Sequence, residues 1–197
     1  MNAPFVRTHE LVTKYHAAPE SVIGWGVGGA ARGRPVRFGS LRLGGFDIVG
    51  IAGDLFTSDK GGFTNPNQAG NLGGGVLHRF AVAFDYANKK MYLVPNADFG
   101  KADAFDRSGL WLLADGDALK VSSVAKDSAA ERAGMHENDR IISIGEQAVK
   151  ERTLAEWRQR LRELPAGTKL EIRFERESKP RSAELVLADR IPPTFMP

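Results

Sequence analysis

The segment SAAERAGMHENDRIISIGEQAV, residues 128–149, decides the fold of the second half of the chain. Ser128 and Glu131 have the spacing of a capping box, which predicts a short helix beginning after Ser128. Gly134 predicts the end of that helix, because glycine adopts the left-handed conformation cheaply. The Asn-Asp pair at 138–139 predicts a turn, and the isoleucines that follow it predict a strand.

The sequence around this segment predicts a small α+β domain. Thr153 and Glu156 also have capping-box spacing, and leucine and tryptophan side chains form one stripe of the helix that they begin, over 153–164. Short apolar runs predict strands, and they lie at 109–113, 118–125, 139–145, 169–175 and 183–189.

The second half resembles a PDZ domain over nearly all of residues 103–191. The resemblance rests on the order helix, Ala133-Gly134, Met135, Asn138-Asp139 and Ile141 at fixed spacing. The usual Asn-Gly turn after the strand is replaced here by Gly145-Glu146, which affects only that turn. The order of elements matches the bacterial, permuted arrangement, in which the ligand-binding strand comes first.

This resemblance implies a site that binds peptide C-termini or extended strands. The backbone N–H groups of residues 109–111 would bind the carboxylate of a peptide C-terminus, and the peptide would add a strand beside 110–113. Helix 153–164 would form the other wall, and Arg107 would add a charge-assisted contact to the carboxylate. The alternative for Arg107 is an ordinary solvated side chain. The residues assigned to the site are Arg107, Ser108, Gly109, Leu110, Trp111, Leu112 and, at the rim, Arg158.

The first half reads as short strands with few helices. Pro4 predicts the start of a helix over 4–15, and glycine-broken apolar residues over 36–51 predict a strand, a turn and another strand. The polar stretch 57–71 predicts a long loop, and the alternation over 80–95 predicts a hairpin with one buried face.

This half resembles a lobe of a retropepsin-like aspartic peptidase, of the bacterial kind that ends in a PDZ domain. One block, which resembles the flap tip that closes over a substrate, comprises Gly24, Trp25, Gly26, Val27, Gly28 and Gly29. Another block, Gly73, Gly74 and Gly75 followed by a helical turn, is similar to the glycine motif that supports the cleft. The hairpin over 80–95 matches the closing hairpin of the lobe.

The catalytic Asp-Thr-Gly or Asp-Ser-Gly of that family does not occur in this sequence. Aspartic peptidases need two carboxylates that share a proton and activate water, so no catalytic residue is assigned and the chain itself is expected to be inactive. We interpret the chain as the C-terminal part of an aspartic endopeptidase that begins just after the catalytic turn. A lobe that has lost this turn is expected to leave strand edges unpaired and to need a partner lobe, from the same chain or by dimerisation. The alternative is a non-catalytic PDZ peptide-binding protein with a degenerate peptidase lobe as scaffold.

These resemblances define the expected architecture: mainly β with short helices, with a partial peptidase lobe over 1–101, a PDZ domain over 102–192 and a tail over 193–197. The net charge is +3, and the sequence does not show the dense Lys/Arg clustering that is typical of nucleic-acid binders. No apolar run is long enough to span a membrane. The four histidines have no metal-ligand spacing, so we assign no metal and no cofactor. The expected partner is a protein or peptide, with salt-sensitive binding to nucleic acid or a membrane surface as a weaker alternative. Nothing in the chain decides the compartment; if the protein is exported to the periplasm, its signal lies outside this sequence.

Overall fold

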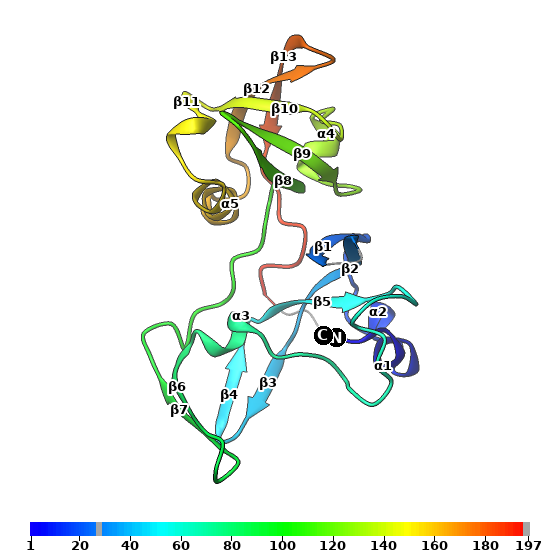
Figure 1. Ribbon diagram of the computed structural model, residues 1–197, viewed down its shortest axis with the longest axis vertical. Helices are drawn as coiled ribbons and strands as arrows, with labels where there is room; N and C mark the ends of the chain where they lie inside the picture. Colours follow the sequence, from blue (N-terminus) through cyan, green and yellow to red (C-terminus); the bar gives the residue numbers. More distant parts are fainter. Residues whose placement is uncertain (27–28, 195–197) are drawn as a thin grey trace. The chain divides into compact units, whose positions relative to one another are not determined.

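The computed structural model describes residues 1–26 and 29–194 and divides into two compact units (Figure 1). One unit contains Met1–Ala17, Val36–Asp103 and the segment that begins at Pro192. The other contains Ala18–Pro35 and Ala104–Ile191. The division at Asp103 lies close to the boundary expected from the sequence. Two segments differ from that expectation. Residues 18–35 belong to the unit of residues 104–191, and residues 192–194 belong to the unit of residues 36–103.

The unit that contains residues 104–191 is built on a six-stranded sheet in the order β13-β12-β10-β9-β8, with β11 paired to β10. All the pairings described for it are antiparallel, and β8 has β9 as its only strand neighbour in the described part of the chain. The strands are β8 (Leu110–Asp115), β9 (Ala118–Val124), β10 (Arg140–Ile144), β11 (Gln147–Ala148), β12 (Lys169–Arg176) and β13 (Lys179–Val186).

Two α-helices and a 3-10 turn complete this sheet and enclose one apolar core: α4 (Ala129–Arg132), η1 (Val149–Glu151) and α5 (Leu154–Glu163). Ser128 and Thr153 accept the N–H groups of Glu131 and Glu156, so both predicted caps are present. Trp157 is fully buried and its indole N–H donates to the carbonyl of Val149 at 2.8 Å. The core therefore fixes α5 against the sheet through an apolar contact and a satisfied polar one.

A hairpin of β1 (Ser21–Gly26) and β2 (Gly29–Arg37) contributes residues 18–35 to the same unit. Its attachment is polar: the Arg190 guanidinium donates to the Ser21 hydroxyl at 2.9 Å. The sequence placed this segment in the first half. The contact between Ser21 and Arg190 was missed because the two residues lie far apart along the chain and no local pattern indicates such a pair.

The unit that contains residues 36–103 consists of small pieces around two apolar clusters. The hairpin of β3 (Ser40–Leu43) and β4 (Phe46–Val49) turns at Gly44-Gly45 as predicted, and β5 (Ala52–Phe56) pairs with β2. The predicted helix over 4–15 is instead two helices, α1 (Ala3–Thr8) and α2 (Leu11–Lys14), because Glu10 adopts a positive φ of 50°. Helix α3 (Gly74–Leu77) follows the glycine motif, and β6 (Phe80–Asp85) and β7 (Lys90–Pro95) form the predicted hairpin.

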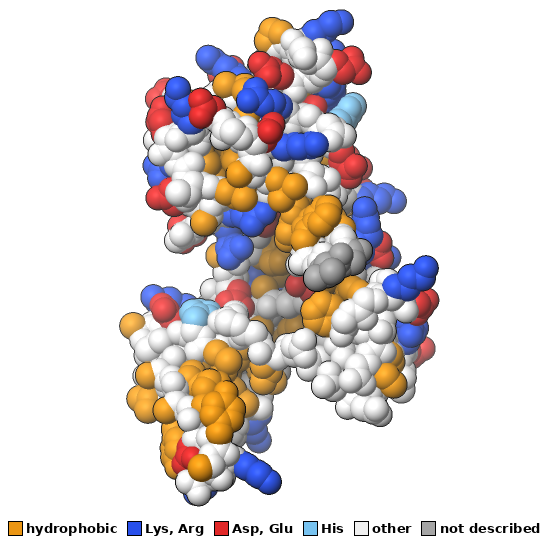
Figure 2. Space-filling view, viewed as in Figure 1, with side chains coloured by type: hydrophobic (Ala, Val, Ile, Leu, Met, Phe, Trp, Pro, Cys, Tyr) orange, Lys and Arg blue, Asp and Glu red, His pale blue; other side chains and the backbone are white. Residues whose placement is uncertain are grey.

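The hairpin of β6 and β7 buries one face only in the half far from its turn. Phe80 is buried, and Val82 and Leu93 pack against the same cluster, whereas Phe84, nearer the turn on that face, is 55% exposed. The opposite face carries Tyr92 and Val94, which are 53% and 62% exposed. Figure 2 shows hydrophobic side chains gathered over this hairpin. In the described residues β6 and β7 have no third strand, so both outer edges of this hairpin are unpaired. Within the described part of the chain β3–β4 and β6–β7 are separate two-stranded sheets and β5 joins the three-stranded sheet β1-β2-β5, so these strands do not form one closed sheet.

A buried ion pair joins α3 to the end of this unit. Arg79 is 1% exposed and its guanidinium donates to Asp103 at 2.8 Å and to the carbonyl of Lys101 at 3.0 Å. Asp103 also accepts the N–H of Ala52 at 2.9 Å. The polar stretch over 96–107 therefore belongs to the fold as far as Asp103, and is not a linker throughout.

Candidate peptide-binding site

Strand β8 presents an unpaired edge beside α5. On one side β8 pairs with β9, with a register shift between Trp111 and Leu112. On the other side the carbonyl of Leu112 accepts a hydrogen bond from the Arg158 guanidinium of α5 at 2.6 Å. Because the N–H and C=O of a strand residue point to the same side, Leu112 presents both groups toward α5. We call the side of β8 on which Leu112 and, two residues on, Ala114 present their backbone groups the β8 edge.

Arg158 covers this edge. Its guanidinium lies 5.3 Å from the centre of the Trp111 ring, in a cation–π contact, as well as on the carbonyl of Leu112. The indole N–H of Trp111 is buried and has no hydrogen-bond partner in the described part of the protein. Sequence reasoning placed Arg158 at the rim of the site, and the structure brings it together with Trp111 and Leu112.

The loop before β8 is tightly packed. Ser108 is fully buried, and Gly109 has a φ of 79°. A Cβ on Gly109 would collide with the side chain of Ser128, so both the conformation and the space require glycine. The carbonyls of Ser108 and Gly109 accept the N–H groups of Ala130 and Ala125, each at 2.8 Å, which anchors the loop to α4 and the segment before it.

The N–H groups of this loop are bonded to side chains. The Asp106 carboxylate accepts the N–H of Gly109 at 2.7 Å and that of Ser108 at 3.2 Å, and the Ser108 hydroxyl accepts the N–H of Leu110 at 3.1 Å. Arg190 donates to the same carboxylate at 3.2 Å. Sequence reasoning missed Asp106 and Arg190. An Asp that precedes Ser-Gly in a turn was the available signal for Asp106, since such side chains often bond to the backbone two or three residues on.

The side chain of Arg107, from the segment before β8, contacts the C-terminal end of α5. Its guanidinium donates to Asp189 at 2.6 Å and to the carbonyls of Arg162 and Leu164 at 2.7 and 3.0 Å. These bonds satisfy carbonyl groups that the end of a helix leaves without partners. The predicted contact between Arg107 and a peptide carboxylate stays a prediction, and this arginine already has an acidic partner.

The two glycine blocks of the first half fall in different units. Gly24, Trp25 and Gly26 lie in β1, and Gly29 opens β2 opposite Gly26, while Val27 and Gly28 lie outside the described residues. Gly73 precedes α3, and Gly74 and Gly75 form its first turn, where the carbonyl of Gly75 accepts a bond from Arg79. Their expected roles as flap and cleft support stay predictions.

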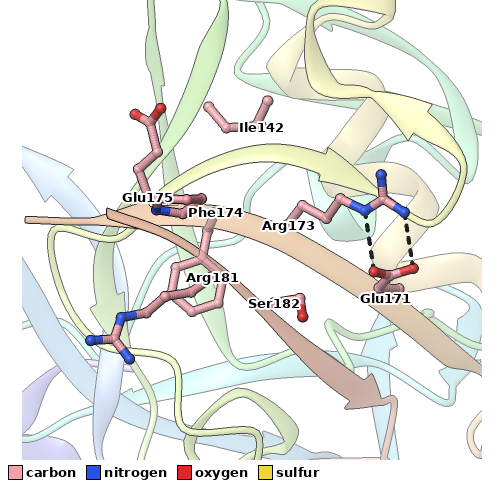
Figure 3. A pocket seen from close by; sticks show the side chains of 8 residues that line it. Ile142, Glu171, Arg173, Phe174, Glu175, Arg181 and Ser182 are labelled. Carbon is pink, nitrogen blue, oxygen red and sulfur yellow. Dashed lines mark hydrogen bonds and ion pairs between the residues drawn. The ribbon is translucent and has the colours of Figure 1, made fainter. Parts of the chain in front are cut away.

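The described residues offer little support for other kinds of site. Among them, no group of three or more His, Asp or Glu side chains could hold a metal ion, and no helix is long and apolar enough to cross a membrane. A shallow hollow lies on the sheet over β10, β12 and β13 (Figure 3). Its charged residues include the ion pair Arg173–Glu171 at 3.1 Å, and none of its described lining residues is a histidine. We therefore place the candidate site at the β8 edge.

The comparisons agree with the unit that contains residues 104–191. The family model described as "PDZ domain" matches residues 120–176. The chain carries a PDZ domain. The match covers β9 to β12 and α5, whereas the loop and strand that form the candidate site, residues 106–115, lie just before it.

Several solved structures are similar to parts of this chain. A serine endoprotease from Yersinia pestis is 20% identical over 40% of this chain and 27% of that enzyme, with a TM-score of 0.35. The PDZ domain of EpsC from Vibrio cholerae is 16% identical over 40% of this chain and 75% of that domain, with a TM-score of 0.29. An HtrA-type protease, AlgW, solved with a decapeptide, is 14% identical over 93% of this chain and 60% of that protein, with a TM-score of 0.44.

These matches limit what is established for the whole chain. It spans 27% of the Yersinia enzyme, and no curated protein matches it. The proteases named above are a serine endoprotease and an HtrA-type protease, so they give no support to the expected resemblance to an aspartic peptidase. The structure of the first half is mainly β with few short helices. Its expected resemblance to a peptidase lobe is not confirmed.

Proposed function

We propose that the PDZ domain binds an extended polypeptide segment by strand addition at the β8 edge. The single observation that carries this proposal is the open edge of β8, where the backbone of Leu112 faces α5 and meets one long side chain instead of another strand. Main-chain hydrogen bonds give such an interaction its affinity, and alternate side chains of the added strand give it specificity.

Arg158 must leave the carbonyl of Leu112 before a strand can add. The exchange is chemically balanced, because an N–H group of the incoming segment replaces the guanidinium as the donor to Leu112. The buried indole N–H of Trp111, which has no partner in the described residues, would gain access to a carbonyl of the segment when Arg158 moves. Binding therefore costs one charge-assisted bond and gains several neutral ones.

Ala114→Pro tests the proposal, because Ala114 presents its N–H on the same side as Leu112 and is exposed. Proline on the open side of an edge strand keeps the pairing with β9 but removes a donor and blocks an added strand. We expect Ala114→Pro to weaken binding of a fluorescein-labelled dodecapeptide, selected on the wild-type chain from a random library, by about tenfold or more in fluorescence anisotropy.

The control is Ala114→Val, which keeps the N–H and favours a strand, and should bind like the wild type. Equal binding by both variants would show that the peptide lies elsewhere on the domain. Circular dichroism should show that both variants are folded, since the side chain at position 114 is exposed.

The first half supports another, finer proposal: that the parent protein is an aspartic endopeptidase and that the PDZ domain presents substrates to it. The support is the order of the glycine blocks and the exposed apolar face of β6 and β7, which a partner lobe or another copy of the chain would cover. Reading the coding sequence upstream of Met1 tests it. An Asp-Thr-Gly or Asp-Ser-Gly there would support the proposal, and an upstream sequence without one favours a non-catalytic peptide-binding protein.

A further inference from the structure

The loop that sequence reasoning assigned to a peptide C-terminus already holds a carboxylate of its own. Of the N–H groups of residues 109–111 that were assigned to a peptide carboxylate, those of Gly109 and Leu110 point to acceptors within the domain, as does that of the neighbouring Ser108. The N–H groups of Ser108 and Gly109 bind Asp106 at 3.2 and 2.7 Å, and that of Leu110 binds the Ser108 hydroxyl at 3.1 Å. Asp106 thus takes the place that a terminal carboxylate would need.

A count of donors and acceptors shows that this arrangement is complete. The Ser108 hydroxyl has one proton, which it donates to Asp106 Oδ1 at 2.7 Å, so its oxygen is free to accept the N–H of Leu110. Asp106 Oδ2 accepts from Gly109 and, at 3.2 Å, from Arg190. The N–H groups of residues 108–110 therefore each have an acceptor, and both carboxylate oxygens are used.

The two arginines near the loop, Arg190 and Arg107, already have acidic partners. Arg190 is largely buried, donates to both Asp106 and Ser21, and lies over the ring of Phe105 at 5.5 Å. Arg107 is bound to Asp189 and to the last carbonyls of α5. Each arginine is thus already paired with a carboxylate, Arg190 with Asp106 and Arg107 with Asp189, which offsets its charge near the loop.

An incoming carboxylate would compete with a tethered one. A group held three residues away along the chain has an effective concentration in the millimolar range or higher, so it wins against a free peptide of modest affinity. If Asp106 stayed in place, the two negative charges would repel each other in a partly buried site. The terminal carboxylate of a peptide therefore adds almost nothing to its binding.

We propose that Asp106 makes this PDZ domain selective for internal extended segments of a protein chain, which bring no terminal carboxylate to the loop. The inference rests on the proposed strand addition at the β8 edge and names its ligand class. Asp106 is a specificity-determining residue here, with Arg190 and Ser108 as the groups that position it. Under this proposal a free C-terminus is not required for binding.

Two phage libraries of random dodecapeptides, selected on the immobilised full chain, test this inference. In one library each peptide ends in a free carboxylate, and in the other it is fused through its C-terminus to the coat protein. We expect the wild type to enrich the fused library at least as well as the free one. In anisotropy, amidating a selected peptide should change its Kd by less than about threefold.

Asp106→Asn should alter this preference, because it removes the competing charge while keeping an acceptor oxygen of the same size. We expect peptides with a free carboxylate to bind this variant about tenfold more tightly than their amidated twins. Asp117→Asn is the matched control: it removes one carboxylate from the exposed β8–β9 turn and should behave like the wild type.

The outcomes separate the two proposals. Enrichment of the free library alone on the wild type, with binding lost on amidation, would overturn the role of Asp106 and leave strand addition intact. No enrichment from either library would overturn strand addition, and the inference with it. One readout needs no ligand: Asp106→Ala, which removes the acceptor altogether, should speed hydrogen exchange of the Gly109 amide about tenfold or more, and an unchanged rate would contradict the bond on which the inference depends.

Discussion

Replacing Asp139 by alanine is expected to lower the free energy of unfolding of the PDZ domain by about 2–3 kcal/mol, because it removes the charge-assisted hydrogen bonds that the half-buried Arg176 makes and leaves a backbone N–H unpaired. Asp139 is fully buried. Its two carboxylate oxygens accept from Arg176 at 2.7 and 2.8 Å, and one of them also accepts the N–H of His136 at 2.8 Å. These bonds tie the turn before β10 to the end of β12.

Urea unfolding followed by tryptophan fluorescence measures this loss, since Trp157 lies in the core of the same domain. Asp117→Ala removes an exposed carboxylate of the same domain and should cost less than about 0.5 kcal/mol. A loss for Asp139→Ala as small as that of Asp117→Ala would show that the buried pair does not hold the turn.

The same residue predicts how stability depends on pH. Burial alone would raise the pKa of Asp139, but the hydrogen bonds from Arg176 and His136 and the charge of Arg176 outweigh it and lower the pKa. A carboxylate whose pKa is lowered on folding contributes stability above its unfolded pKa, near about 3.9, and loses it as the pH falls through the folded value. The difference in free energy of unfolding between the wild type and Asp139→Ala should therefore be complete above about pH 5 and shrink as the pH falls below it.

Gly109→Ala is expected to cost about 3 kcal/mol or more and to lower the melting temperature by about 10–20 °C. A left-handed φ of 79° costs about 1 kcal/mol for a residue with a Cβ. The larger part comes from the collision with Ser128, which is buried and cannot retreat, because its hydroxyl caps α4 by accepting the N–H of Glu131 at 3.2 Å.

Gly116→Ala separates the two contributions. Gly116 has a φ of 58°, but a Cβ there would meet nothing within 4 Å, so this variant should lose only about 1 kcal/mol. Differential scanning calorimetry of both variants measures the difference. If Gly109→Ala melts within a few degrees of Gly116→Ala, the loop is not packed against Ser128 as described.

The features that the sequence predicted correctly are local ones. The caps at Ser128 and Thr153, the left-handed Gly134 with a φ of 72°, and the turn at Asn138 with a φ of 71° all depend on residues within one turn of each other. Each of these features depends on a short stretch of sequence, and in the PDZ half many of the expected residue types occur at the expected spacing. This is why the α+β domain could be predicted from its sequence.

The features that the sequence did not predict depend on distant residues. The bond between Arg190 and Ser21 joins the β1–β2 hairpin to the PDZ unit, and the pair Arg79–Asp103 extends the other unit through a polar stretch. In β6 and β7 the face predicted to be buried is covered at Phe80 but exposed at Phe84, although both residues belong to the same alternation. Periodicity predicts a strand and its two faces, but it cannot say whether another element covers one of them.

The candidate site shows the same division. The strand over 110–112 and Arg158 were predicted, because the spacing of a PDZ domain places a strand and a helix side by side. The role of Asp106 was missed, although it lies in the same turn, because a carboxylate-binding loop was expected to be open. Whether a donor is free or already satisfied depends on the conformation of side chains, which residue spacing does not define.

Amide hydrogen exchange on the full chain, with and without a selected dodecapeptide, tests strand addition most directly. If the peptide adds to the β8 edge, the amides of Leu112 and Ala114 become protected by about tenfold or more, while those of β13, at the other edge of the same sheet, do not change. Protection of β13 with β8 unchanged would place the ligand at the opposite edge and contradict the site proposed here.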